Sequence, residues 1–168
     1  RLLEDALALA QDLDQPWILA TSWLNLGLAQ LNAQRTEEAR AAVGEALGRY
    51  AEIGDDRFRA RCLAYLGLAS LLEGDLTRAR TLLAQSLAVF DEVREPGGIA
   101  EGLIGLAAVC AAAGDPSRAA ILSGAGERVH ESIGGRALPF DHRATDRHLE
   151  TGRAELGPEL WAEGVRRG

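Results

Sequence analysis

The chain has 168 residues, of which 47% are hydrophobic and 5% aromatic, and its formal net charge is −7. This hydrophobic content excludes a disordered tail, and the excess of acid argues against a nucleic-acid partner, whose binding needs a basic face that displaces counterions. No apolar run approaches the roughly 18 residues of a membrane span, so we expect no membrane association. The abundance of Ala and Leu favours helices over strands.

A repeated pattern with a period of 40 residues organises the chain. Segments 23–40, 63–80 and 103–120 read WLNLGLAQLNAQRTEEAR, LAYLGLASLLEGDLTRAR and LIGLAAVCAAAGDPSRAA. A fixed period of this length is typical of a stack of similar supersecondary units. Apolar residues recur at helical spacing within each unit, so we expect an all-α chain of stacked antiparallel helix pairs.

The expected helices follow one another with short turns, marked by Gly, Pro and Asp, between them. Because the first helix has no partner before it, we expect it to belong to a truncated unit and the chain to be a fragment of a larger protein. The helices are expected over 2–13, 16–33, 36–53, 57–73, 76–93, 99–113, 116–133, 141–156 and 159–165. The single expected domain, 1–168, divides into 1–14 (second helix of the truncated repeat), the repeats 15–54, 55–94 and 95–134, and the C-terminal capping helices in 135–168.

The turn between the two helices of a pair carries a capping signal. Gly74 and Gly114 can adopt the left-handed conformation that ends a helix. Asp75 and Asp115 can then accept hydrogen bonds from the free N–H groups that begin the next helix. The corresponding first turn lacks both residue types, and Thr36 is the expected cap there.

The helix-pair pattern resembles the tetratricopeptide repeat (TPR). The usual period of that repeat is about 34 residues, and the period of 40 seen here also fits HEAT-like repeats. The Gly-Asp turn ahead of an alanine column favours the tetratricopeptide assignment. That resemblance implies a right-handed superhelical α-solenoid of about three and a half repeats with a C-terminal capping helix. The residues that carry it are Trp23, Leu26, Gly27, Leu63, Leu66, Gly67, Leu103, Leu106, Ala107, Ala39, Ala79 and Ala119.

The long repeat and the C-terminal part resemble the repeat region of large bacterial regulators: the LuxR-type and maltose-regulator-like ATPases and their antibiotic-regulator relatives. Residues 118–125 and 160–164 resemble the end of that region. The family's nucleotide-binding and helix-turn-helix motifs are absent here, so neither activity is carried over. The resemblance implies a cytoplasmic, non-catalytic domain of a transcriptional regulator that docks a protein or senses an effector. A stand-alone scaffold or adaptor unrelated to transcription is the alternative.

No arrangement of polar residues predicts catalysis. His142 and His148 are six positions apart, which places them on different helix faces, whereas a zinc pair is spaced by about four. His130 falls in one column with Tyr50 and Phe90, where packing or partial exposure accounts for it. No Ser/His/Asp or Cys/His set is supported. We therefore expect no catalytic residue, no metal and no cofactor.

The two cysteines and the glycine-rich stretches have structural interpretations. Cys62 and Cys110 are too few for a disulfide framework and are expected as buried thiols in a reducing compartment. The stretches 97–105 and 123–126 suggest a phosphate-binding loop, but such a loop follows a strand. In an all-helical chain, close helix packing through small residues is the favoured interpretation.

The first helix of each pair is expected to line a concave groove, as in tetratricopeptide stacks. An exposed apolar groove usually has an occupant, here a partner protein or peptide helix, a neighbouring domain of the parent chain, or a second copy in a homodimer. The alternative is that superhelical curvature buries the groove residues against one another. The expected groove residues are Thr21, Leu24, Asn25, Leu28, Leu31, Arg61, Ala64, Tyr65, Leu68, Leu71, Glu101, Ile104, Ala108 and Ala111.

Three polar positions in this groove qualify the prediction. Asn25 alone is suggestive of a clamp for acidic peptide tails, so such a tail is disfavoured. Arg61 and Glu101 occupy equivalent positions on adjacent helices at the expected rim. We therefore expect them to form an ion pair, worth about 0 to 1 kcal/mol if it is exposed.

Overall fold

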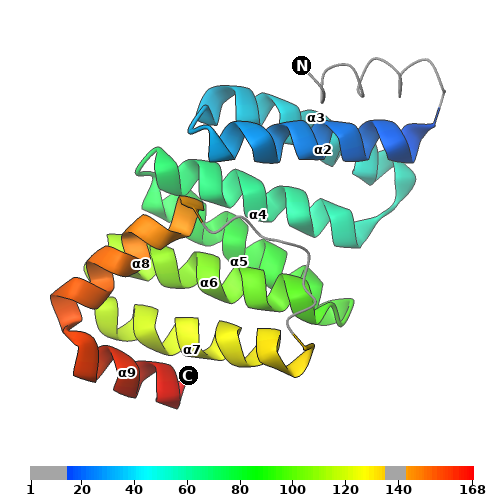
Figure 1. The fold of residues 1–168 in the computed structure, drawn as a ribbon. Helices are drawn as coiled ribbons and strands as arrows, with labels where there is room; N and C mark the ends of the chain where they lie inside the picture. The colour runs from blue at the N-terminus through cyan, green and yellow to red at the C-terminus, as the bar shows by residue number, and fades with distance from the viewer. Residues whose placement is uncertain (1–14, 135–142) are drawn as a thin grey trace.

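The computed structural model describes residues 15–134 and 143–168. The predicted helix over 2–13, the beginning of the one over 141–156, and His142 lie outside the described residues. Within the described ranges all regular secondary structure is α-helical, and no helix there is long and apolar enough to cross a membrane. The helices are α2 (Pro16–Asn32), α3 (Thr36–Ile53), α4 (Asp56–Leu72), α5 (Leu76–Glu92), α6 (Pro96–Ala112), α7 (Pro116–Ser132), α8 (Arg143–Leu156) and α9 (Pro158–Arg167) (Figure 1).

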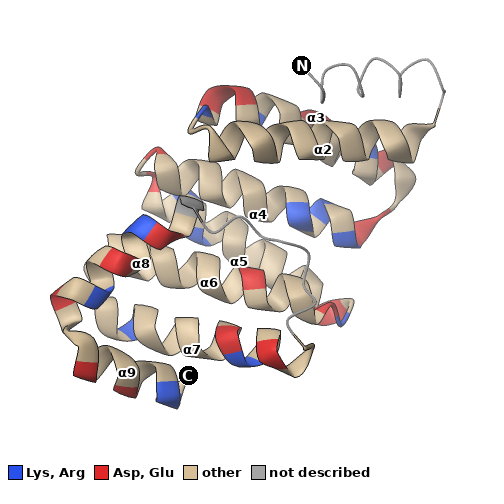
Figure 2. Cartoon of the chain, viewed as in Figure 1, with Lys and Arg blue, Asp and Glu red and all other residues tan. Residues whose placement is uncertain are grey.

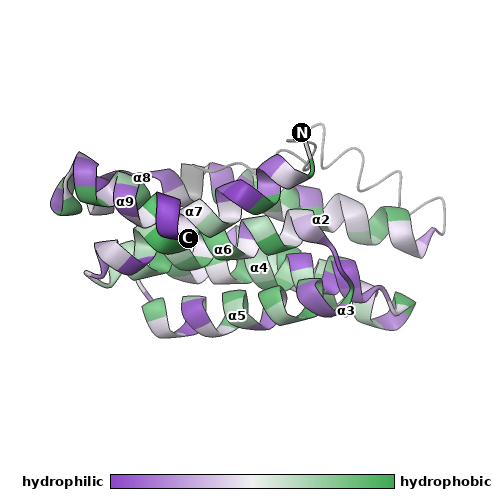
Figure 3. Cartoon of the chain, turned by 90° about the horizontal axis from the view of Figure 1, so that it is seen from below, coloured by the Kyte–Doolittle hydropathy of each residue, from purple (hydrophilic) through white to green (hydrophobic). Residues whose placement is uncertain are grey.

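Consecutive helices pack against one another along the chain. The most extensive contacts join α2 to α3, α4 to α5 and α6 to α7, and each pair meets the next through α3–α4 and α5–α6. Figure 3 shows α3 and α5 on one side of α4 and α6, and α8 on the other side. This arrangement of stacked neighbours is consistent with an α-solenoid.

The predicted capping turns are confirmed at two positions. Gly74 and Gly114 have φ angles of +82° and +77°, in the left-handed region that glycine adopts without steric cost. The side chains of Asp75 and Asp115 each accept a hydrogen bond of 3.0 Å from the backbone N–H three residues later. These contacts stabilise the starts of α5 and α7.

At the first turn the predicted cap is wrong. Gln34 takes the left-handed place with φ +58°, so Arg35 becomes the residue before the helix and Thr36 the first helical residue. No side chain caps α3. In place of a cap, Glu37 and Glu38 lie in the first turn, where carboxylates interact favourably with the helix dipole.

The helix α6 begins at Pro96, three residues before the predicted start at 99. Glu95 precedes it, and the Glu95 side chain accepts a hydrogen bond from the backbone N–H of Gly98. The proline therefore lies in the first helical turn, where its fixed φ fits and its missing N–H costs nothing. The pattern Pro-Gly-Gly predicted a longer turn because all three residues are common turn formers.

In the first two helix pairs, a glycine on the first helix packs against a large side chain on the second. A Cβ added at Gly67 would lie 2.8 Å from Leu83 Cγ, and one at Gly27 would overlap Val43 Cγ2. The same register places Ala107 opposite Ser123, both buried. In the third pair Ala107 replaces the glycine, and Ser123 replaces the larger Val43 or Leu83, so the two helices can still approach closely.

Glycines also bring α6 close to α5. A Cβ at Gly105 would lie 2.8 Å from Leu83 Cδ2, one at Gly102 would lie 3.2 Å from Leu87 Cδ1, and one at Gly98 would overlap the ring of Phe90. These glycines are helical and face packed side chains. The prediction of close helix packing is thus confirmed for residues 97–105, and the phosphate-loop interpretation has no support there.

Candidate functional site

Most of the predicted groove residues are buried, so the described residues leave no continuous open apolar groove. Thr21, Leu28 and Ile104 are half-buried and only Asn25 is exposed. The buried members are Leu24, Leu31, Arg61, Ala64, Tyr65, Leu68, Leu71, Glu101, Ala108 and Ala111.

The helix α8 covers part of this face. It packs on α6 and α7 and also touches α2 and α4, whereas α9 packs mainly on α7 (Figure 1). Leu149 of α8 packs against the main hydrophobic cluster. At Gly152 an added Cβ would lie 2.9 Å from Ala111 Cβ, so α8 approaches α6 closely there. The two predicted capping helices therefore have different positions. The α9 helix packs on α7 of the last helix pair, and α8 packs across the first helices of the pairs, mainly on α6.

The predicted pair of Arg61 and Glu101 is present but buried. Arg61 Nε lies 4.0 Å from Glu101 Oε2, and the two side chains are 9% and 6% exposed. Neither of these atoms has a hydrogen-bond partner among the described residues. The pairing is confirmed, but the pair is buried and does not lie at an exposed rim.

Burial shifts the pKa of the Glu101 carboxyl group in this pair. It raises the pKa of Glu101 to about 7, against the opposing effect of Arg61, and the carboxylate of Glu95 raises it further. At 4.0 Å and without a hydrogen bond, the guanidinium does not offset the loss of hydration. Glu101 therefore gains and loses its charge near neutral pH.

An aromatic cluster adjoins Arg61. Tyr50 stacks on Phe58 with ring centroids 5.0 Å apart, and Trp17 meets Phe58 edge-on at 5.6 Å. The guanidinium of Arg61 lies 5.8 Å from the centroid of Phe58, within the range of a cation–π interaction. The Tyr50 hydroxyl shares a hydrogen bond of 2.8 Å with Thr21 Oγ1. The basic start of α4, blue in Figure 2, therefore lies beside this aromatic cluster.

The two cysteines are free and buried, as predicted. Burial raises the pKa of Cys62 to about 12 and also raises the pKa of Cys110. Because the thiolate is the reactive form, both thiols are inert near neutral pH. Within residues 15–134 and 143–168 no group of three or more His, Cys, Asp or Glu side chains could hold a metal ion.

A cavity lies on the face that α8 covers. It measures about 280 Å³ and lies between α6, α7 and α8. Ser123, at its wall, is 5% exposed, and Ser123 Oγ has no hydrogen-bond partner in the described part of the chain. The cavity combines two aliphatic side chains with two carboxylates, an imidazole and a hydroxyl. Its described lining residues are Ile104, Ser123, Glu127, His130, Asp146 and Leu149.

Sequence reasoning missed this cavity, although a signal for it exists. Of its lining residues only Ile104 was among the predicted groove residues. In the 40-residue register, Ser123 stands where Val43 and Leu83 stand earlier, and His130 stands where Tyr50 and Phe90 stand. Two large buried residues are thus replaced by smaller or more polar ones on the same helix. That double departure from the repeat pattern marks the cavity.

A second hollow of about 440 Å³ lies between α8 and the turns that follow α4 and α6. Its described lining includes the turn residues Gly74 and Gly114. The first cavity is walled by residues of three helices and carries two carboxylates and an imidazole, so it is the better candidate for a binding site.

No family model matches the chain, and no curated protein matches it in sequence. The tetratricopeptide and regulator assignments thus depend on the residues that carry the resemblance. They stay predictions.

Proposed function

We propose that the chain is a non-catalytic recognition domain that binds a small effector in the cavity between α6, α7 and α8. The observation that carries this proposal is a cavity of about 280 Å³ whose wall joins two aliphatic side chains to two carboxylates and an imidazole. Small-molecule sites typically combine an apolar lining with a few polar groups that fix the orientation of the ligand.

Effector sensing is favoured over the docking of a helix on the predicted groove. A docked helix needs an open apolar groove for its own apolar side chains, and ten of the fourteen predicted groove residues are buried. The cavity volume is close to the lower end of the roughly 300–1,000 Å³ that small-molecule sites occupy. It suits a compact molecule.

Binding at this place would act on α8. Asp146 and Leu149 of α8 form one wall of the cavity, and α6 and α7 form the rest. A ligand that contacts both walls binds best when α8 is packed on α6, so it shifts the population toward that arrangement. The position of α8 is then the signal that a neighbouring part of the protein reads.

The wider assignment belongs to the same proposal. In it the helix pairs form a right-handed superhelical stack of tetratricopeptide type, with about three and a half units and a C-terminal cap. The domain works in the cytoplasm as part of a bacterial transcriptional regulator of the LuxR type. The support for this context is the likeness of residues 118–125 and 160–164 to the end of the repeat region in those regulators.

A fragment titration followed by two-dimensional NMR tests effector binding. A mixed set of cationic, neutral and anionic fragments should include members that shift amide signals of α6, α7 and α8 together. Ile104→Trp, which fills the cavity, should abolish these shifts. Ile53→Trp at the exposed end of α3 is the matched control and should keep them. If no fragment of any charge binds, or if binding survives Ile104→Trp, the proposal is wrong.

A further inference from the structure

We infer that the joint between the starts of α4 and α6 binds a small oxyanion, a carboxylate or phosphate group, in a hollow beside Arg57, Phe58 and Arg61. This site is separate from the cavity between α6, α7 and α8, and the inference goes beyond the proposed function. Three observations carry it: a buried guanidinium without a hydrogen bond, a second arginine without an ion pair, and neighbouring carboxylates that already have partners.

Arg61 is a buried cation with free hydrogen-bond donors. It is 8% exposed and lines a hollow of about 60 Å³, whose other described lining residues are Arg57, Phe58 and Glu95. Its Nε is enclosed without a hydrogen-bond partner, whereas its two terminal nitrogens are not fully enclosed and donate no hydrogen bond to a described residue. Glu101 lies 4.0 Å from Nε, beyond hydrogen-bond distance. A buried guanidinium is usually satisfied by an oxyanion that accepts two of its N–H groups, and Glu101 does not do this.

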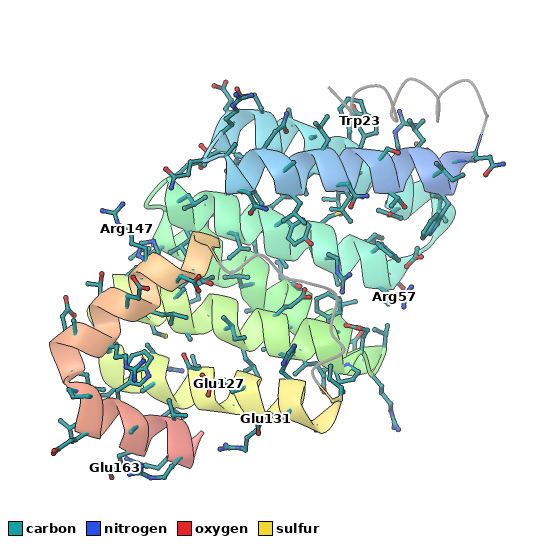
Figure 4. All side chains as sticks on the ribbon, in the orientation of Figure 1. Trp23, Arg57, Glu127, Glu131, Arg147 and Glu163 are labelled. Atoms are coloured by element: carbon teal, nitrogen blue, oxygen red, sulfur yellow. The ribbon has the colours of Figure 1, made fainter. Side chains whose placement is uncertain are left out.

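Arg57 brings a second guanidinium to the same hollow. The Cζ atoms of Arg57 and Arg61 lie 5.0 Å and 5.8 Å from the centroid of the Phe58 ring. The two arginines are four positions apart on α4, a spacing that places side chains on one face of a helix. No ion pair within the described residues involves Arg57, which Figure 4 shows at the outer end of α4. An oxyanion in the hollow would therefore meet two guanidinium groups.

The carboxylates around this hollow have other partners. Asp55 and Glu95 each accept a hydrogen bond from a backbone N–H group, in the first turns of α4 and α6 respectively. Asp56 forms an ion pair with Arg59. These contacts leave the two lining arginines without a hydrogen-bonded acid, so an anion from solution can supply one.

The size of the hollow limits what enters it. A water molecule occupies about 30 Å³ in the liquid, so a hollow of about 60 Å³ holds a group of only a few heavy atoms. The planar fork of a guanidinium matches the oxygen atoms of a carboxylate or a phosphate. Either group fits as the terminal group of a ligand whose remaining part lies outside the hollow.

Titrations with acetate, inorganic phosphate and neutral acetamide test the inference. The arginine Nε–Hε signals in heteronuclear NMR spectra report on each guanidinium separately. At pH 6 and constant ionic strength, acetate should shift the signals of Arg57 and Arg61 and bind at least about tenfold more tightly than acetamide, because only the anion forms charge-assisted hydrogen bonds. Phosphate should shift the same signals, and the tighter of the two anions identifies the preferred group.

Variants assign the binding to the hollow. Arg61→Met should reduce the affinity for acetate about tenfold or more. Arg57→Gln, at an exposed position that does not endanger the fold, should reduce it about threefold. The matched control is Arg59→Gln, which removes the same charge from the same turn but lies outside the described lining. It should leave the affinity unchanged.

The pH dependence gives the site a second signature. Burial raises the pKa of Glu101 to about 7, so its carboxylate competes with the ligand for Arg61 at pH 8 and is mostly protonated at pH 6. The other titratable groups that interact with Glu101 are Glu95 and Tyr65, and burial raises the pKa of Tyr65, which stays neutral over this range. Acetate is ionised at both pH values, so its affinity should be about threefold higher at pH 6, and Glu101→Gln should remove the difference.

Several results would overturn the inference. These are no shift of the Arg57 and Arg61 signals with either anion, equal binding of acetamide, or equal weakening by Arg59→Gln, which would show a general charge effect. An affinity for acetate that is equal at pH 6 and pH 8 would place the anion away from Arg61. None of these results bears on the cavity between α6, α7 and α8, because its test uses other residues.

Discussion

The joint between α3 and α4 and the joint between α5 and α6 connect equivalent helices by different packing. The first is filled by large side chains from both helices, with the rings of Tyr50 and Phe58 stacked at 5.0 Å. The second is filled from α5 alone, because α6 presents glycines to Phe90, Leu87 and Leu83. The α4 residues Phe58, Cys62 and Tyr65 correspond, 40 positions later, to Gly98, Gly102 and Gly105 of α6.

The comparison shows that the helix register can be kept while the sizes of the packed side chains change. Both joints keep the same element order and the same turns, so the period of 40 residues does not require identical packing. The aromatic joint holds polar partners, since Tyr50 shares a hydrogen bond with Thr21 and Arg61 lies near Phe58. The glycine joint has no room for such groups. The two joints should therefore respond differently to substitution.

The largest expected effect comes from giving the glycine joint a side chain. Gly98→Val should destabilise the fold by about 3 kcal/mol or more, because its Cβ would overlap the ring of Phe90. Chemical denaturation measures the change. In the double variant with Phe90→Ala, the cost of Gly98→Val should fall by at least about 1 kcal/mol. Strict additivity of the two changes would contradict the account of this joint.

The ion pair that connects α4 to α6 should be asymmetric. Glu101→Leu replaces the polar carboxyl group beside Arg61 by an alkyl group while the guanidinium stays buried and charged at any practical pH, and we expect a cost of about 2–3 kcal/mol. Arg61→Met leaves a carboxyl group that can take up a proton, because burial raises the pKa of Glu101 to about 7. At pH 6 that variant should cost about 1 kcal/mol. The reverse order of the two unfolding free energies would refute the asymmetry.

The same carboxyl group predicts a pH dependence of opposite sign to that of an ordinary surface acid. The pKa of Glu101 rises from 4.5 to about 7 on folding, so the folded chain keeps a proton that the unfolded chain releases. The resulting stabilisation is complete below pH 4.5 and is lost as the pH rises through 7. The unfolding free energy of the wild type minus that of Glu101→Gln should fall by on the order of 2 kcal/mol between pH 5 and pH 8. A flat difference would show that burial does not shift this pKa.

The smallest expected effect concerns a glycine outside both joints. An added Cβ at Gly44 of α3 would meet nothing within 4 Å. Gly44→Ala should therefore stabilise the protein by about 0.5–1 kcal/mol through helix propensity. Equilibrium denaturation with urea is the measurement. A loss of stability at Gly44 would contradict the contrast between glycines that receive a neighbouring side chain and glycines that do not.

The helices and their turns could be predicted from the sequence because their causes are local. Apolar spacing set the limits of α4 and α5 to within a residue, and the Gly-Asp pairs marked the turns that φ +82° at Gly74 and +77° at Gly114 confirm. The pairing of Arg61 with Glu101 was also predictable, because equal positions in adjacent units lie side by side.

The cavity could not be predicted, because one of its walls comes from α8, whose position the repeat pattern does not set. The burial of the ion pair could not be predicted either, because the repeat gives the register of adjacent helices and not what covers them. The α8 helix is polar along most of its length, and its described buried and half-buried positions are Thr145, His148, Leu149, Gly152 and Leu156. These positions have helical spacing, but only Leu149 and Leu156 among them are large and apolar, so the sequence gives a weak apolar signal for the contact face. Ser123 and His130 depart from their columns, but the departure indicates a cavity only once the covering helix is known.

The most direct measurement of the central claim, that a small ligand binds between α6, α7 and α8, is intermolecular NOE spectroscopy of the protein with a fragment that shifts the amide signals of these helices. Contacts should appear between the protons of the fragment and the methyl groups of Ile104 and Leu149, which line the cavity. Ile53, Val93 and Leu160 are exposed aliphatic residues outside it and should show none. Contacts to these exposed methyl groups in place of Ile104 and Leu149 would contradict the claim.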